Sequence, residues 1–307
     1  MRRRFIPALI CCSVFAGIPA IVNQVHLLVA SGDLVSARRE LKQFRDAKGT
    51  TPEYLEALSW IGRGELALRN FPAAEQNSGE VRKLCLDQTA HRKLDADSSL
   101  PTALGASIEV EALALAIQGR RDEAVLFLRD EARRWHDTSI LPRIQKNLNL
   151  LTLEGKPAPP LETSVALTGR KLQTLAQHRG HPVLLFFWAH WCSDCKQEIA
   201  IVEQLEAKFA RRGLVVIAPT QHYGYVAGGL DAAPAIETKY IREVFARYYA
   251  GLGPVEIPLS ERNFTAWGVS TTPTLALVDS QGIVRLYNPG TMAYGPLASR
   301  IEALLLR

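Results

Sequence analysis

The stretch that decides the fold of the C-terminal half is Val183-Leu-Leu-Phe-Phe-Trp-Ala-His-Trp-Cys-Ser-Asp-Cys-Lys-Gln-Glu198. Its first six residues are apolar and have the length of a buried strand, and the residues after the cysteines have helical spacing. Cys192 and Cys195 therefore fall on the first turn of a helix that follows a buried strand. The free N–H groups and partial positive charge of a helix start stabilise a thiolate. The spacing predicts a dithiol redox site.

A CxxC pair can also be half of a zinc site or a permanent structural disulfide. Zinc is disfavoured because the remaining cysteines, Cys11, Cys12 and Cys85, form no second pair and no histidine stands at ligand spacing. A structural role is disfavoured because a bridge across three residues at a helix start is strained and reducible. We therefore expect no metal and no bound cofactor, the reacting group being the Cys192-Cys195 disulfide itself.

Three motifs in the C-terminal half give the sequence a resemblance to the thioredoxin-like fold and, more narrowly, to the exported TlpA/ResA-type thiol-disulfide oxidoreductases. They are Gly155-Lys-Pro-Ala-Pro-Pro-Leu161, the stretch quoted above, and Trp267-Gly-Val-Ser-Thr-Thr-Pro-Thr-Leu-Ala-Leu-Val-Asp279. The resemblance spans about Gly155 to Arg307. It implies an α/β thioredoxin-like domain with a central mixed sheet, and the alternating strand and helix patterns place helices on both faces of that sheet.

The resemblance also implies roles for individual residues. Cys192 is expected to be the exposed nucleophile, and the buried Cys195 resolves the mixed disulfide. Thr272-Pro273 is expected to hold a cis peptide bond that turns the Thr272 backbone toward an extended substrate segment, the alternative being an ordinary trans proline. Trp191 is expected to form an apolar lip for partner docking, the alternative being simple packing.

Several side chains near the cysteines are expected to tune the site. Many thioredoxins carry a buried Asp at the position of Phe186, so Glu198 is expected to accept the proton instead, unless it is a solvated helix carboxylate. Asp194 should disfavour the thiolate, raising the pKa of Cys192 and favouring a reductant. His190 would act the other way if protonated, and the alternative is an exposed rim histidine without a role.

The order of elements expected in the C-terminal domain follows from the apolar patterns. It comprises a strand and turn over 162–172, a short helix reaching residue 177, strands over 183–188 and 214–218, a helix over 192–211, an insertion over 220–253 that contains a helix at 236–249, and a strand over 255–259. The insertion departs from minimal thioredoxin.

Residues 24–153 have helical spacing and no alternating strand pattern. Three segments repeat a local signature that resembles the inter-helix turn of tetratricopeptide-type helical pairs: Gly32-Asp-Leu-Val-Ser-Ala37, Arg69-Asn-Phe-Pro-Ala-Ala74 and Gly119-Arg-Arg-Asp-Glu-Ala124. Gly62 and Ala112 stand where that family needs a small residue. The polar stretch 87–101 is expected to loop out. Such a degenerate helical-repeat domain binds a protein partner along a groove, or serves as a spacer or dimerisation module.

The N-terminus has the features of a targeting segment. Arg2, Arg3 and Arg4 precede an apolar stretch over residues 5–22, with cleavage candidates after Ala16 and Ala20. The alternatives are an uncleaved membrane anchor and a lipoprotein modified at Cys11 or Cys12. All three export the globular part. The expected domains are a signal peptide or membrane anchor at 1–22, a helical domain at 23–153, a proline-rich linker at 154–160 and a thioredoxin-like domain at 161–307.

These features together predict an exported, periplasmic thiol-disulfide oxidoreductase that reduces protein disulfides and is itself reduced by an upstream thiol electron donor. The resemblance suggests cytochrome c maturation or thiol recycling. The alternatives are a disulfide-forming oxidant, a peroxidase, which is disfavoured because Ala189 stands where peroxiredoxins have threonine, and a non-catalytic adaptor with a vestigial dithiol. Nucleic-acid binding is excluded: the net charge of +5 lies largely in the leader arginines, and no basic stripe with aromatics remains. Cys85 is expected to be a buried apolar residue.

Overall fold

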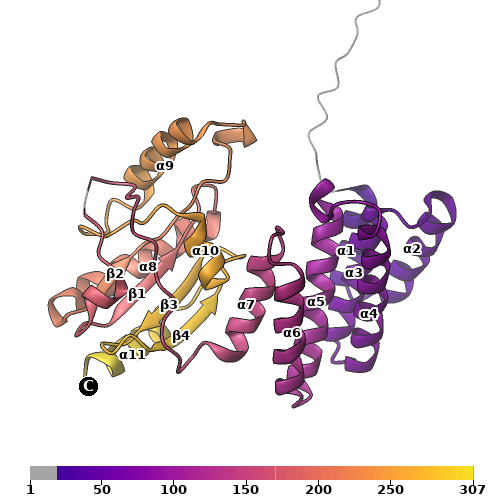
Figure 1. Ribbon diagram of the computed structural model, residues 1–307, viewed down its shortest axis with the longest axis horizontal. Helices are drawn as coiled ribbons and strands as arrows, with labels where there is room; N and C mark the ends of the chain where they lie inside the picture. The colour runs from indigo at the N-terminus through magenta and orange to yellow at the C-terminus, as the bar shows by residue number, and fades with distance from the viewer. Residues whose placement is uncertain (1–18, 170, 307) are drawn as a thin grey trace, which may run out of the picture. The chain divides into compact units, whose positions relative to one another are not determined.

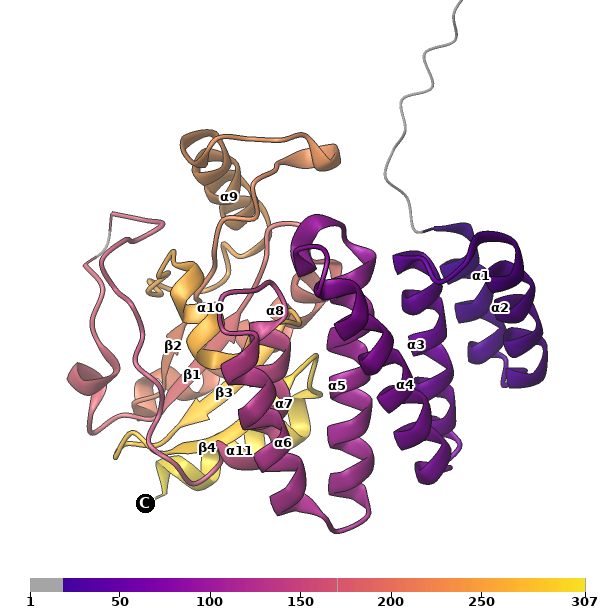
Figure 2. The same cartoon turned by 45° about the vertical axis from the view of Figure 1, so that its right-hand side comes forward.

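The computed structural model describes residues 19–169 and 171–306, which form two compact units that divide between Leu104 and Gly105 (Figures 1 and 2). The expected leader, residues 1–22, lies almost wholly outside the described residues. Its last residues belong to the first helix, where Ile21 and Val22 are buried. The chain is therefore part of a packed fold from the start of that helix onward.

The first unit is helical. It contains α1 (Ala20–Ala30), α2 (Leu34–Lys48), α3 (Pro52–Ala67), α4 (Phe71–Thr89), a 3₁₀ turn at Leu94–Ala96 and the beginning of α5 (Ser99–Ile117). Helix α1 contacts α2 and α3, and α3 contacts α4. The all-helical region expected from the sequence is confirmed. The expected loop over 87–101 is shorter, because α4 continues through Thr89 and α5 begins at Ser99.

The three repeated signatures lie at the turns between consecutive helices. Each turn contains a residue with left-handed backbone geometry: Gly32 at φ 81°, Arg69 at φ 60° and Gly119 at φ 83°. Glycine adopts this geometry without steric cost, so the turns end one helix and let the next fold back. The alanine that ends each signature is fully buried: Ala37, Ala74 and Ala124. The repeats are therefore helical pairs with small residues at the contacts.

Helix α5 is long and apolar enough to cross a membrane, but 61% of its apolar window is buried inside the protein, as in a core helix. Its second half joins α6 (Arg121–Arg134) and α7 (Leu141–Thr152) in the second unit. Glu109 on α5 accepts hydrogen bonds from Arg143 at 2.6 Å and Lys146 at 2.8 Å on α7. These partly buried ion pairs fix α7 against α5.

Helix α7 also packs on the C-terminal domain. Asn149 donates to the carbonyl oxygen of Trp267 at 2.8 Å, at the end of α10 (Glu261–Trp267). A Cβ at Gly268, which has φ 62°, would lie 2.5 Å from the backbone nitrogen of Lys146, so only glycine fits there. The expected linker is likewise bound, since Gly155 donates its N–H to the carbonyl of Val284. The last helices of the helical region thus belong to the same compact unit as the sheet.

The second unit is built on a four-stranded mixed sheet in the order β2-β1-β3-β4 (Figure 1). The strands are β1 (Val183–Phe187), β2 (Val215–Ile217), β3 (Thr274–Val278) and β4 (Val284–Pro289). β1 pairs in parallel with β2 and antiparallel with β3, and β3 pairs antiparallel with β4. β1 is therefore a central strand, and the residues that follow it emerge from the middle of the sheet edge.

Helices cover both faces of this sheet. Leu184 and Phe186 of β1 pack with α8 (Ser193–Phe209), α9 (Pro234–Tyr248) and α11 (Tyr294–Leu305). The side chains of Leu185 and Phe187 point to the opposite face of the sheet, where they pack with Phe264 and Trp267 of α10. This two-sided burial explains the uninterrupted apolar run of β1. The expected α/β thioredoxin-like architecture is confirmed.

Two of the expected strands do not form continuous ladders among the described residues. Segments 162–172 and 255–259 make only the isolated bridges Ala166 to Pro258, Ile217 to Glu256 and Thr220 to Leu259. Pro258 has no N–H to donate, which prevents a continuous ladder there. The remaining short elements are 3₁₀ turns at Leu175–His178, Ala210–Arg212 and Ala227–Gly229.

Candidate active site

The two cysteines lie at the start of α8. Cys192 is the N-cap of this helix, and its Sγ accepts the backbone N–H of Cys195 at 3.0 Å. The two sulfurs are joined in a disulfide. A sulfur that accepts an N–H at a helix N-terminus is in the environment that favours a thiolate. The geometry expected for a dithiol redox site is thus present, with Cys192 as the sulfur that is stabilised.

The expectation that Cys192 is exposed is wrong for this disulfide form. Cys192 is 3% exposed and Cys195 is fully buried, both within the apolar cluster beneath the sheet edge. The carbonyl oxygen of Thr272 lies 3.3 Å from Sγ of Cys192 and covers it. Because the proline loop sits over the disulfide, only a small part of the first sulfur faces solvent. An incoming disulfide must therefore approach beside this loop.

The Thr272-Pro273 peptide bond is cis, as expected. It immediately precedes β3 and is anchored by the next residue, Thr274, whose hydroxyl donates to the carbonyl of Thr271 at 2.7 Å. The Thr272 backbone, although 80 residues away in the sequence, therefore lies against the dithiol. Pairing of that backbone with a substrate segment remains a prediction.

Trp191 stands beside the dithiol with its side chain 48% exposed. Its ring meets the ring of Tyr223 edge to face, with centroids 5.4 Å apart. The indole therefore has one aromatic neighbour and a large exposed surface, as the expected apolar lip requires. Trp188, in contrast, is fully buried and donates its Nε1–H to the carbonyl of Ala218.

Glu198 is buried rather than solvated, with 2% exposure, so the alternative of a solvated helix carboxylate is wrong. It follows Cys195 by three residues on α8, which puts the two on one face of the helix. Its Oε1 accepts the backbone N–H of Met292 at 3.1 Å. Burial raises the pKa of the Glu198 carboxyl, and this hydrogen bond only partly opposes the shift. A buried carboxyl with a raised pKa can take up and release a proton near the thiols.

Asp194 points into solvent at the surface of α8. The hydroxyl of Ser193 donates to Oδ1 of Asp194 at 3.4 Å. Water and salt screen an exposed charge strongly. The effect of Asp194 on the thiols remains a prediction, and its exposure makes that effect small.

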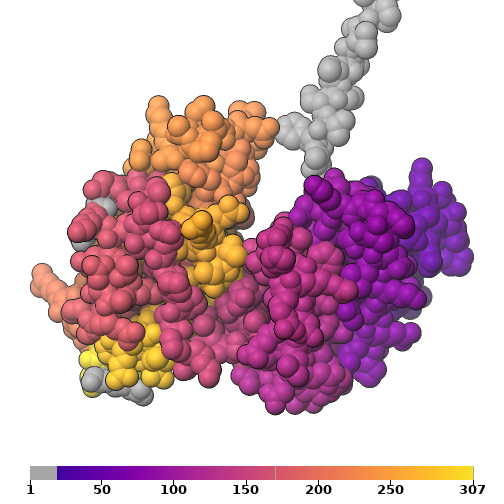
Figure 3. Space-filling view, in the orientation of Figure 1, coloured from indigo at the N-terminus to yellow at the C-terminus, as the bar shows by residue number. Residues whose placement is uncertain are grey.

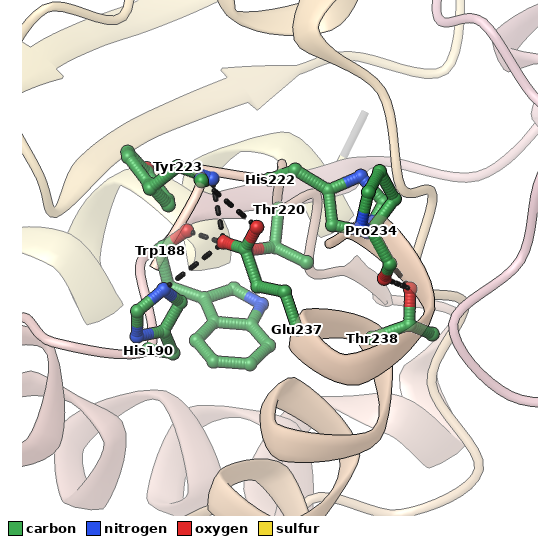
Figure 4. Close-up of polar contacts among 9 residues, drawn as sticks. Trp188, His190, Thr220, His222, Tyr223, Pro234, Glu237 and Thr238 are labelled. Atoms are coloured by element: carbon green, nitrogen blue, oxygen red, sulfur yellow. Dashed lines mark hydrogen bonds and ion pairs between the residues drawn. The ribbon is translucent and has the colours of Figure 1, made fainter. Parts of the chain in front are cut away.

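His190 is not an exposed rim residue, so that alternative is wrong. It is 1% exposed, and its Nε2 lies 3.2 Å from Oε1 of Glu237 (Figure 4). Burial lowers the pKa of His190, with Lys196 and His222 acting in the same direction and Glu237 opposing them. Burial therefore disfavours the protonated imidazole. The effect of a protonated His190 on the thiolate remains a prediction.

The partner of His190 comes from the insertion. Glu237 lies on α9 and also accepts the backbone N–H groups of Tyr223 at 2.5 Å and Gly224 at 2.9 Å (Figure 4). The hydroxyl of Thr220 donates to the carbonyl of Trp188 at 2.9 Å, so the start of the insertion is also bonded to the residue that follows β1. Sequence reasoning missed Glu237. The only available signal was the tyrosine-rich composition of the loop, because no spacing links positions 190 and 237.

No group of three or more His, Cys, Asp and Glu side chains within the described part of the chain could hold a metal ion. The remaining described cysteine, Cys85, is fully buried in α4, and burial raises the pKa of its thiol to about 12. A thiol of that kind is unreactive at neutral pH. Cys85 is thus the buried apolar residue that the sequence predicts, and among the described residues the redox-active thiols are the pair at the start of α8.

Comparisons with known proteins find similarity to thiol-disulfide oxidoreductases and thioredoxin-like proteins. The sequence profile of the AhpC/TSA family matches residues 155–221. Thiol-disulfide oxidoreductase ResA of Geobacillus thermodenitrificans is 29% identical over 150 residues, which cover 49% of this chain and 77% of that protein. Thioredoxin-like protein YneN of Bacillus subtilis is 30% identical over 149 residues, 48% of this chain and 79% of its own length. A solved structure from Chlorobium tepidum, described as a thiol:disulfide interchange protein DsbE, is 26% identical and has a TM-score of 0.39. The match covers 50% of this chain and 97% of that chain.

Proposed function

The chain belongs to the TlpA/ResA-type thioredoxin-like thiol-disulfide oxidoreductases, and from this premise we propose that it works as a reductant of protein disulfides outside the cytoplasm. Cys192 is the nucleophile and Cys195 the resolving thiol in this proposal. The observation that carries it is the Sγ of Cys192, which accepts the N–H of Cys195 at the start of α8 and faces the Thr272 carbonyl.

The reaction begins with the reduced dithiol. The thiolate of Cys192 attacks one sulfur of the substrate disulfide, that disulfide breaks, and the second substrate sulfur leaves as a thiolate and takes a proton. The thiol of Cys195 then loses its proton and attacks Sγ of Cys192. The bond between Cys192 and the first substrate sulfur breaks, and that sulfur leaves as a thiolate and is protonated in turn. The substrate has gained two electrons and two protons, and the protein holds the Cys192–Cys195 disulfide that its fold accommodates.

Proton transfer is the step for which the fold provides a dedicated group. Cys195 is fully buried, so its proton cannot pass directly to solvent. Glu198 is buried one helical turn further along α8. Its raised pKa brings the carboxyl closer to the range in which it can accept a proton from a thiol and return it. Phe186 occupies the position of the buried aspartate of many thioredoxins, and we assign the proton-accepting role to Glu198.

Export is supported by the sequence of the N-terminus, where three arginines precede an apolar segment. In an oxidising compartment a reductant must be regenerated. The protein therefore requires an upstream thiol donor that returns Cys192–Cys195 to the dithiol. Thiol recycling and cytochrome c maturation are both processes that need such a reductant.

The test is a disulfide-reduction assay with the exported protein, a protein substrate with accessible disulfides, and a small dithiol as electron donor. We expect turnover by the wild type and complete loss in Cys192→Ser. Cys85→Ala is the matched control, because it removes a buried thiol that cannot react and should keep full activity. Turnover that survives Cys192→Ser would exclude Cys192 as the nucleophile. A wild type that only oxidises dithiols would favour the oxidant, and an inert wild type would favour the adaptor.

A further inference from the structure

The insertion over residues 220–253 projects from the sheet domain in the space-filling view (Figure 3), and its helix α9 packs on the sheet core through Ile241 and Val244. Minimal thioredoxin lacks it, and the reaction steps above do not use it. Its attachment to the active-site loop is nevertheless specific. His190, two residues before Cys192, and Glu237 on α9 are each 1% exposed at the side chain and face each other at 3.2 Å.

Both oxygens of the Glu237 carboxylate take part in this attachment. Oε1 accepts from Nε2 of His190 and from the backbone of Tyr223, and Oε2 accepts from the backbone of Gly224. Because a carboxylate can only accept, the shared bond places the imidazole proton on Nε2. A buried charge with three donors is satisfied, whereas a neutral replacement would leave at least one buried N–H without an acceptor. The cluster therefore has one stable arrangement.

The position of Tyr223 follows from that arrangement. Its backbone is held by Glu237, and its ring contacts both His190, at 5.5 Å between centroids, and Trp191, at 5.4 Å. The rings of Tyr225 and Tyr240 also contact the imidazole, with centroid distances of 5.4 Å and 5.3 Å. Trp191 is bonded directly to Cys192 in the chain and is half exposed. The turn at Tyr223 and Gly224, which Glu237 holds, therefore supplies the aromatic ring that contacts the exposed indole of Trp191.

We propose that the His190–Glu237 pair is a positioning device that holds Tyr223 behind Trp191 and thereby gives the protein its preference for protein disulfides over small ones. This rests on the proposed function. A partner protein must cover the Trp191 face, and a preordered aromatic anchor contributes more to such a contact than a mobile one. A small disulfide reaches Cys192 without covering the indole, so its rate does not depend on where Trp191 rests.

The first variant that tests this is Glu237→Gln, which keeps the side-chain size but removes one acceptor. We expect the ratio of kcat/KM for a protein disulfide to kcat/KM for a small aromatic disulfide to fall about tenfold, mainly through a higher KM for the protein. Glu243→Gln is the matched control, since Glu243 lies on the same helix in an exposed pair with Lys239 at 4.0 Å. This control should leave the ratio unchanged.

Two substitutions at position 190 separate positioning from bulk packing. His190→Gln can still donate a hydrogen bond from its Nε2 to Glu237 and should keep much of the ratio. His190→Phe keeps the ring but has no donor, so it should lower the ratio as Glu237→Gln does. In a Trp191→Ala background, Glu237→Gln should have little further effect, because the group that the pair positions is gone. Equal losses on both disulfides, or full additivity with Trp191→Ala, would overturn the proposal.

Hydrogen exchange at the backbone amides of Tyr223 and Gly224 provides a measurement that does not depend on activity. Both amides should be protected in the wild type and exchange faster in Glu237→Gln, while the amides of β1 stay protected. If the wild type reduces neither disulfide, the proposed function fails, and this exchange experiment still decides whether Glu237 holds the turn. Unchanged protection in Glu237→Gln would refute the positioning role by itself.

Discussion

The carbonyl oxygen of Thr272 lies 3.3 Å from Sγ of Cys192, across 80 residues of sequence. The same sulfur accepts the N–H of Cys195 at 3.0 Å. The N–H favours a negative sulfur and the carbonyl dipole disfavours one, so the two backbone groups set opposing fields on the nucleophile. The carbonyl also covers the sulfur. The loop that ends at Pro273 therefore affects both the charge of the Cys192 sulfur and its exposure to solvent.

The first prediction concerns the resolving thiol. Cys195→Ser should attack substrate through Cys192 but should be unable to release it, because no second thiol can close the ring. We expect a covalent adduct with substrate proteins from the native compartment, visible as a reductant-sensitive band on non-reducing gels. The double variant Cys192→Ser with Cys195→Ser is the control and should trap nothing. An adduct that forms equally well in this control would point to another thiol.

The second prediction concerns the pH dependence of stability at Glu198. Burial raises the pKa of this carboxyl above its ordinary value of 4.5. Between 4.5 and the folded pKa, the folded protein binds more protons than the unfolded chain, so the free energy of unfolding falls as pH rises. Glu198→Gln does not titrate and should lose this component. The wild type should therefore lose stability relative to Glu198→Gln as pH increases through the window, which thermal unfolding at several pH values would measure.

The same substitution should change the kinetics of reduction. If Glu198 accepts the proton of Cys195, Glu198→Gln should slow resolution of the mixed disulfide by about 10²-fold or more and alter the pH profile of the rate. Glu203→Gln on the same helix is the control. A pH profile of unchanged shape would remove Glu198 from the proton path, even if the rate were lower.

The third prediction concerns His190 and has the opposite sign. Burial lowers the pKa of His190 below its ordinary value of 6.5. As pH falls below 6.5, the unfolded chain binds a proton that the folded protein resists, so the folded state loses stability down to the folded pKa. His190→Gln does not titrate. We expect the wild type to lose stability relative to this variant on acidification, and a constant difference between pH 7 and pH 5 would contradict the burial of a neutral imidazole.

The fourth prediction concerns Asp194. Its carboxylate should disfavour the Cys192 thiolate, so Asp194→Asn should lower the pKa of Cys192 and raise the reduction potential of the pair. The side chain is exposed, and the screened effect should stay below about 30 mV, which corresponds to about 1.4 kcal/mol. Ultraviolet titration of the thiolate and equilibration with a thiol buffer would measure both quantities. An unchanged pKa would mean that the charge does not act on the sulfur.

The fifth prediction concerns the domain boundary. A chain that begins at Gly155 loses the hydrogen bond from Asn149 to Trp267 and the packing of Leu153 in the sheet core. Its free energy of unfolding should be lower by about 3 kcal/mol or more than that of a chain that begins at Ser99. Urea unfolding of the two truncated chains measures the difference. Equal stability would support a boundary at the linker.

The proposed partner-binding role of the helical region is tested with the same two chains. If this region selects substrates, both truncated chains should reduce a small disulfide as the full chain does, yet should be slower with the proteins trapped by Cys195→Ser. A helical spacer would give equal rates with those proteins.

Local sequence determined the elements that carry the chemistry. The apolar run that became β1 can only be buried on both faces, and the residues after it can only start a helix, so Cys192 and Cys195 had to lie on a first turn. The turns at Gly32 and Gly119 were equally local, because a left-handed residue ends a helix wherever it stands. These features depend on neighbours within a few residues of one another, and for that reason the sequence reveals them.

The tertiary structure alone decided the burial of the site. Cys192 is covered by a carbonyl 80 residues away. The pKa of His190 is lowered because α9 and the tyrosines around the imidazole bury it, and Glu198 is buried beside the backbone of Met292. Helix α7 belongs with the sheet because Gly268 admits the backbone of Lys146. In each case the exposure and protonation of a side chain depend on groups that the chain brings close only when it folds, and no periodicity or spacing along the sequence encodes that proximity.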